Sequence, residues 1–159
     1  MTTSMSSAPG ASSRDGLVGA VDRAYGWLDR VPYSLLAIPL RAAVAVVFWN
    51  SAQTHLANWD TTLTLFEQEY KVPLLSPAFA AGLTAAIEVS MPVLLVLGLA
   101  TRAAALLLLG MTAVIEIFVY PQAWPTHIQW AAMMLVLLCR GAGIFSLDEL
   151  IRRWAHLRR

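Results

Sequence analysis

The sequence predicts an all-α membrane protein, a four-helix transmembrane bundle with short amphipathic surface helices at the N-terminus, in the first outer loop and at the C-terminus. Of its 159 residues, 58% are hydrophobic and 13% are charged, whereas a soluble domain carries roughly 25% charged residues. A helix needs about 20 apolar residues to cross the core of a bilayer. We find four such runs within a membrane domain at residues 33–145. They cover about residues 33–55, 77–99, 101–120 and 125–140, and the last run is slightly short.

The N-terminal segment precedes the first apolar run. Residues 1–16 are rich in small and polar residues and show no apolar signal-peptide core, so we expect a flexible tail. Residues 17–31 then place Leu17, Val21 and Leu28 on one helical face, with the charged residues elsewhere. This periodicity predicts an amphipathic helix, which lies either on the membrane surface or against the protein itself.

The first predicted span, residues 33–55, has Arg41 in its early turns and a polar, aromatic far end. Residues 56–75 form the longest connection in the chain. Asp60 can cap a short helix there that runs through Tyr70, because apolar residues recur along one side of this segment. We therefore expect a second surface helix in the first outer loop.

The end of the chain predicts a third surface helix, over residues 146–159. Arg140 and the glycines that follow it stop the fourth span. Ser146 and Glu149 have the spacing of a capping box, in which each side chain bonds the backbone N–H of the other residue. Beyond them, apolar residues follow one face and four arginines lie elsewhere. Such a basic amphipathic helix suits anionic lipid headgroups.

The basic residues are distributed unevenly about the predicted spans. Ten of the 11 lysines and arginines lie at one end of the spans, and only Lys71 lies at the other. Cytoplasmic segments carry such an excess of positive charge, so both termini of this multi-pass protein are predicted to be cytoplasmic. Because the charges flank membrane segments, the lipid bilayer is the expected partner and nucleic acid is not.

Glu88 and Glu116 are candidate functional residues inside the spans. Each is the only ionisable side chain in its long apolar run. A carboxylate that faces lipid is costly, so each should point into the bundle and have a partner. We hypothesise that Arg41 pairs with Glu88; alternatively, Arg41 snorkels to the interface. Arg102, at the corner between the second and third spans, is a further cavity candidate. The two glutamates have either a functional role or a structural role in helix packing.

The outer ends of the helices carry a second set of candidates. Two histidines and four aromatic residues are candidate ligand-binding groups: His55, His127, Trp49, Tyr120, Trp124 and Trp130. The histidines could ligate haem or a metal ion, but nothing in their spacing demands it, so we assign no metal site. The aromatic residues fit the border of a quinone headgroup and equally an ordinary aromatic belt. Cys139 is the only cysteine, which excludes an intramolecular disulfide and a CxxC redox pair.

Three segments of the chain form a recognisable pattern, AAIE at residues 85–88, LGLATRAAA at residues 97–105 and RGAGIFSLD at residues 140–148. In this order they resemble the DoxX family, and the similarity covers about residues 35–150. The resemblance implies a small protein of the bacterial inner membrane. The family takes its name from membrane subunits of thiosulfate:quinone oxidoreductase, and other members are linked to oxidative-stress complexes.

Residues 66–75 and 117–127 are similar to a narrower subgroup, the DoxX-type proteins encoded beside bufferin-type cassettes for copper-binding peptides. The resemblance therefore implies two functions. The first is a membrane subunit or accessory of a quinone-linked redox or stress-response system, with Glu88 and the outer aromatic residues lining a ligand cavity. The alternative is a non-catalytic accessory of a copper or metal-stress peptide system. Both imply membrane or periplasmic partner proteins. Enzyme activity, the cofactor (a quinone or a metal ion) and homo-oligomerisation stay open.

Overall fold

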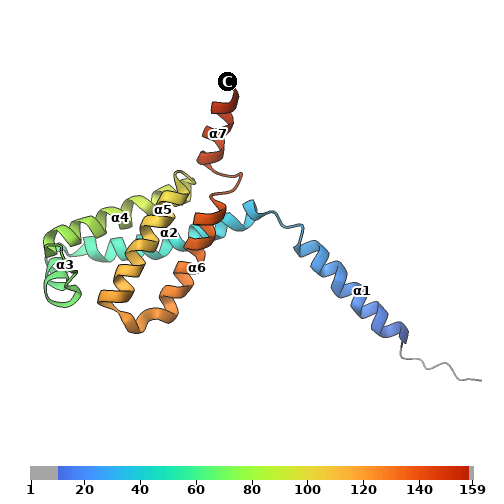
Figure 1. The fold of residues 1–159 in the computed structure, drawn as a ribbon, viewed down its shortest axis with the longest axis horizontal. Coiled ribbons are helices and arrows are strands. Elements are labelled where there is room, and N and C mark those ends of the chain that lie inside the picture. The colour runs from blue at the N-terminus through green and yellow to red at the C-terminus, as the bar shows by residue number, and fades with distance from the viewer. Residues whose placement is uncertain (1–10, 158–159) are drawn as a thin grey trace, which may run out of the picture. The chain divides into compact units, whose positions relative to one another are not determined.

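The computed structural model describes residues 11–157, and every regular element in that range is helical (Figure 1). The all-α prediction is therefore confirmed. The chain divides after Pro32 into two compact units. The first contains α1 (Ala11–Leu28), which begins inside the segment expected to be a flexible tail. The earlier part of that segment and the terminal Arg158 and Arg159 lie outside the described residues.

The second unit is built on four long helices, α2 (Tyr33–Ala57), α4 (Pro77–Leu97), α5 (Thr101–Val114) and α6 (Trp124–Arg140). Two short turns connect the last two of these helices, the π-helical η2 (Ile115–Val119) and the 3-10 turn η3 (Pro121–Ala123). In the described part of the chain, three segments are long and apolar enough to cross a membrane, residues 33–57, 77–97 and 101–119. Because α6 has only 17 residues, the fourth span stays a prediction.

The four long helices pack as two pairs, α2 with α4 and α5 with α6, and the pairs meet through α4 against α5 and α2 against α6. The two helices of each pair run in opposite directions (Figure 1). All four helices contribute to one apolar core, which includes Val44, Phe48, Leu95, Leu108, Met134 and Leu137. At the start of α2, the Tyr33 hydroxyl donates to the carbonyl oxygen of Gly141, 2.7 Å away. Helix α6 thus returns the chain to the end of the bundle where α2 begins, which supports a fourth crossing.

The long connection between α2 and α4 contains the expected short helix. Helix α3 (Trp59–Leu65) continues into the π-helical turn η1 (Phe66–Tyr70). The predicted cap was wrong, because the side chain of Asn58 accepts the bond from the Thr61 N–H at 3.0 Å. Asp60 already lies within the first turn, where a carboxylate can only complement the helix dipole.

The corner between α4 and α5 depends on a glycine. Gly98 has a φ of +65°, a conformation that glycine adopts at no steric cost. A β-carbon at this position would collide with the guanidinium of Arg41 and would lie 2.6 Å from Cβ of Ser146. The corner is therefore a point of close approach between α2, α4 and the C-terminal segment.

Asp148 holds the same corner from a distant part of the sequence. Its carboxylate oxygens accept hydrogen bonds from the backbone N–H groups of Ala100 at 2.7 Å and Thr101 at 3.0 Å. Its own N–H donates to the carbonyl oxygen of Gly98 at 2.9 Å. The first N–H groups of a helix have no partner within the helix, so Asp148 acts as a cap of α5 supplied from the far end of the chain.

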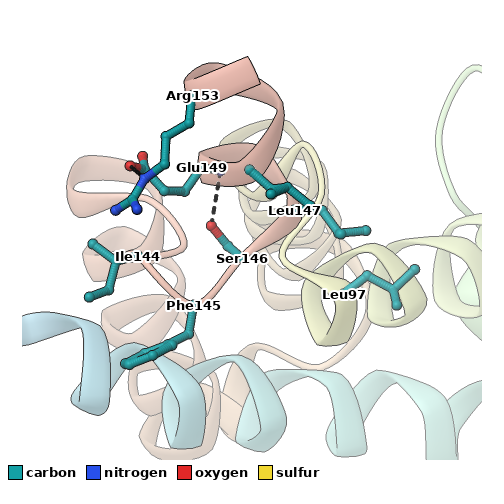
Figure 2. Close-up of a pocket in the computed structure, with 8 residues that line it drawn as sticks. Leu97, Ile144, Phe145, Ser146, Leu147, Glu149 and Arg153 are labelled. Carbon is teal, nitrogen blue, oxygen red and sulfur yellow. Dashed lines mark hydrogen bonds and ion pairs between the residues drawn. The ribbon is translucent and has the colours of Figure 1, made fainter. Parts of the chain in front are cut away.

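Helix α7 (Leu147–Leu157) begins directly after the predicted cap residue, Ser146. The Ser146 hydroxyl accepts from the backbone N–H of Glu149 at 3.3 Å, as Figure 2 shows. The Glu149 carboxylate contacts Arg152 and Arg153 and not the backbone N–H of Ser146. Of the two hydrogen bonds of the predicted capping box, only the one to the Ser146 hydroxyl is therefore formed. Both arginines donate hydrogen bonds to it and lower the pKa of Glu149. The surface location of α7 stays a prediction.

Replacing Gly98 by alanine should destabilise the protein by about 1–3 kcal/mol, the usual cost of forcing a side chain into a disfavoured backbone conformation. Thermal unfolding of the purified protein in detergent measures the effect. Gly110→Ala is the matched control, because a β-carbon there would meet nothing within 4 Å and alanine favours a helix. Equal melting temperatures for the two variants would contradict the close approach at the corner.

Candidate functional site

The carboxylate of Glu88 is held between α4 and α2. Its side chain is 2% exposed, and its Oε2 lies 2.7 Å from Nδ1 of His55. Its Oε1 accepts a hydrogen bond of 2.8 Å from the hydroxyl of Ser51. Ser51 and His55 are four residues apart in α2 and therefore share one helical face. The polar end of the first span thus supplies both partners of the Glu88 carboxylate.

The contact between His55 and Glu88 can hold a proton. A hydrogen bond joins the two groups whether the proton sits on the imidazole or on the carboxyl group. Two contacts fix the position of His55: its backbone carbonyl accepts a 2.7 Å bond from the Thr62 hydroxyl, and the Phe66 ring lies 6.0 Å from its ring. Helix α3 and turn η1 therefore cover the histidine from the outer loop.

A second carboxylate–imidazole pair joins η2 to α6. Oε2 of Glu116 lies 2.6 Å from Nδ1 of His127, and their side chains are 28% and 9% exposed. Glu116 sits in a π-helical turn, a local distortion that recurs at functional sites. The ring of Trp130 lies 5.1 Å from the His127 ring and 5.9 Å from the Phe48 ring. Aromatic packing thus connects this pair to α2.

The predicted pairing of Arg41 with Glu88 was wrong. Arg41 is buried, and its Nη2 donates to the carbonyl oxygen of Phe145 at 2.9 Å. Arg41 and Ser51 lie ten residues apart, about 15 Å along an α-helix, and it is the Ser51 end of α2 that meets Glu88. The arginine therefore belongs to the corner at Gly98 and does not pair with the acid.

The remaining candidates lie apart from the Glu88 pair. Arg102 is exposed at the start of α5, and its Nη2 donates a 3.4 Å hydrogen bond to the carbonyl oxygen of Cys139 near the end of α6. Trp49 and Trp124 are exposed. Tyr120 donates a 2.6 Å hydrogen bond to Glu69, which is the main reason that the pKa of Tyr120 is raised.

Two partners escaped sequence reasoning, Ser51 and Glu69. Ser51 lies four residues before His55, and this spacing could have indicated that both side chains lie on the same face of α2. Nothing in the sequence links Glu69 to Tyr120. In the described part of the chain, no three histidine, cysteine, aspartate or glutamate residues lie close enough together to hold a metal ion. Each predicted histidine ligand contacts a glutamate through its Nδ1.

These features define an integral membrane protein whose apolar helices carry two carboxylate–imidazole pairs. A sequence model of the DoxX family matches residues 36–121, which is more than half of the chain. The chain belongs to the DoxX family. The matched range contains His55, Glu88 and Glu116 and ends before His127. No curated protein and no solved structure gives a significant match.

Removal of the buried acid should cost more stability than removal of the half-exposed one. Glu88→Ala leaves Ser51 and His55 without their partner, at about 1–3 kcal/mol for each buried group so orphaned. Glu116→Ala should cost less because solvent or headgroups can replace its contact. Thermal unfolding in detergent compares both with Glu67→Ala, an exposed control in η1. An equal effect of Glu88→Ala and the control would refute the buried pair.

Proposed function

We propose that this protein is a membrane subunit of a quinone-linked redox system, in which the His55–Glu88 pair exchanges protons with a bound quinone. The observation that carries the proposal is a 2% exposed carboxylate bonded to an imidazole within apolar helices. Ionisable groups inside membranes are expensive and typically functional. A histidine paired with a carboxylate is also a common proton donor and acceptor.

A groove between α2 and α4 supports a quinone as the ligand. It has a volume of about 300 Å³ and is lined by apolar residues together with Trp49 and Asn50, within the size range of small-molecule sites. Asn50 directly precedes Ser51, the partner of Glu88. An apolar groove on the lipid-facing side suits the ring and tail of a quinone.

The chemistry divides between this chain and a partner. Reduction of a quinone to a quinol consumes two electrons and two protons. The His55–Glu88 pair would donate or accept protons at the quinone oxygens, and a redox partner protein would supply or remove the electrons. The charge distribution supports an orientation with both termini in the cytoplasm, and His55 and the outer loop would then lie on the periplasmic side of the bacterial inner membrane.

The alternative function is a non-catalytic accessory of a copper or metal-stress peptide system. The observation that favours it is the contact between the two segments that resemble the bufferin-associated subgroup. The ring of Tyr70 lies 5.7 Å from that of Tyr120, and Tyr120 is hydrogen-bonded to Glu69. Together they form an outer surface that a partner could recognise. This function predicts copurifying partners and no quinone binding.

A measurement of quinone binding distinguishes the quinone-linked function from the non-catalytic alternative. The protein in lipid nanodiscs should bind a short-chain ubiquinone analogue, read as quenching of its tryptophan fluorescence. Val93→Trp would fill the groove, which Val93 lines, and should weaken binding at least about tenfold by steric exclusion.

The control for this experiment is Leu106→Trp, a substitution at an exposed position of α5 outside the residues that line the groove. It should leave the affinity unchanged. Absence of binding by the unmodified protein, or an equal loss in both variants, would overturn the quinone proposal.

A further inference from the structure

A cavity with charged residues in its lining lies at the opposite end of the bundle from the outer loop. It has a volume of about 690 Å³, and its lining comes from the starts of α2, α5 and α7 and from the end of α6. Three of the lining residues are the arginines Arg102, Arg140 and Arg152. Three helices that are distant in sequence, α5, α6 and α7, therefore bring positive charge to one hollow.

Two of these charges are not neutralised by the acids that line the cavity. Asp148 uses both carboxylate oxygens to cap α5, and Glu149 is bonded to Arg152 and Arg153. Neither Arg102 nor Arg140 forms an ion pair with a carboxylate within the range 11–157. An anion that entered the cavity would therefore meet positive charge.

The two arginines are held in place by neutral contacts. Arg140 lies over the ring of Tyr33, 5.1 Å from its centroid, and the hydroxyl of that tyrosine is anchored on Gly141. Arg102 passes across the same loop, with Nε 3.5 Å from where a β-carbon of Gly141 would stand. Both guanidinium groups are thus oriented before any ligand arrives, which reduces the entropic cost of binding.

The depth of the cavity indicates the source of the anion. The apolar run of α5 starts at Thr101 and helix α6 ends at Arg140, so in a bilayer the cavity would lie where the apolar core gives way to the headgroup layer. Ile144, one of the lining residues, is 53% exposed and offers apolar surface for an acyl chain. These features favour a membrane lipid over a soluble anion.

We propose that this cavity binds the phosphodiester headgroup of an anionic phospholipid, with Arg102 and Arg140 as its ligands. Guanidinium groups match phosphate oxygens in geometry and can donate two parallel hydrogen bonds. The site is distinct from the His55–Glu88 pair and does not depend on the quinone proposal. A lipid bound there would tie the loop at residues 141–146 to the membrane.

Native mass spectrometry of the full chain with added lipids tests the site. The unmodified protein should retain phosphatidylglycerol in preference to phosphatidylcholine, and inorganic phosphate alone should bind far more weakly. Arg102→Gln/Arg140→Gln should lower the affinity for phosphatidylglycerol about thirtyfold, because each basic contact to an anionic lipid contributes about fivefold. Arg102→Lys/Arg140→Lys should give an intermediate loss, since charge is kept and the paired bonds are not.

The control is Arg23→Gln/Arg30→Gln, which removes the same charge outside the cavity and should keep the preference. Equal losses in the control and in the cavity variant would show non-specific attraction and overturn the site. Equal retention of the two lipids by the unmodified protein would overturn it even if the glutamine variant failed to fold. Binding of free phosphate as tight as that of the lipid would overturn the assignment to a membrane lipid.

Discussion

The structure depends on one constraint, that a carboxylate inside apolar helices must find partners within the protein. Lipid tails offer no hydrogen bonds, so an unpaired carboxylate in the bundle would be strongly destabilising. Glu88 meets Ser51 and His55 of α2, and Glu116 meets His127 of α6. The two acids thus join the same helices that pack as pairs, α2 with α4 and α5 with α6.

The opposite end of the bundle is held by a different mechanism. There the C-terminal segment folds back over the turn between α4 and α5, where Asp148 caps α5 and Arg41 binds the carbonyl of Phe145. Gly98 makes this approach sterically feasible. The corner and the tail that resemble the DoxX family are therefore physically one feature, since each supplies the hydrogen-bonding partners of the other.

The sequence predicted the helices well and their side-chain partners poorly. Long apolar runs mark α2, α4 and α5, and isolated acids within such runs demand burial. A linear pattern gives the position of a residue along its helix but not the neighbouring helix that it faces. We therefore hypothesised that Arg41 pairs with Glu88. In the structure Glu88 bonds Ser51, and Arg41 lies about three helical turns from Ser51 along α2.

Two further differences have the same origin. Asp148 caps a helix that starts 47 residues earlier (148 minus 101), a contact that only the folded chain creates. Asn58, and not Asp60, caps α3 because Asn58 has an extended backbone whereas Asp60 lies inside the first turn, a difference in conformation that the sequence does not reveal. The chain's membrane class, by contrast, follows from composition, since the spans and the acids within them need no tertiary information.

The central claim is that four helices cross lipid and bring the two termini of the bundle to one face. In a Cys139→Ala background, Lys71→Cys marks the loop after α2 and His156→Cys marks the end of α7, and both positions are exposed. A membrane-impermeant maleimide should label position 71 in intact bacterial spheroplasts, and position 156 only after the membrane is permeabilised. Labelling of both positions from the same side would contradict the four crossings.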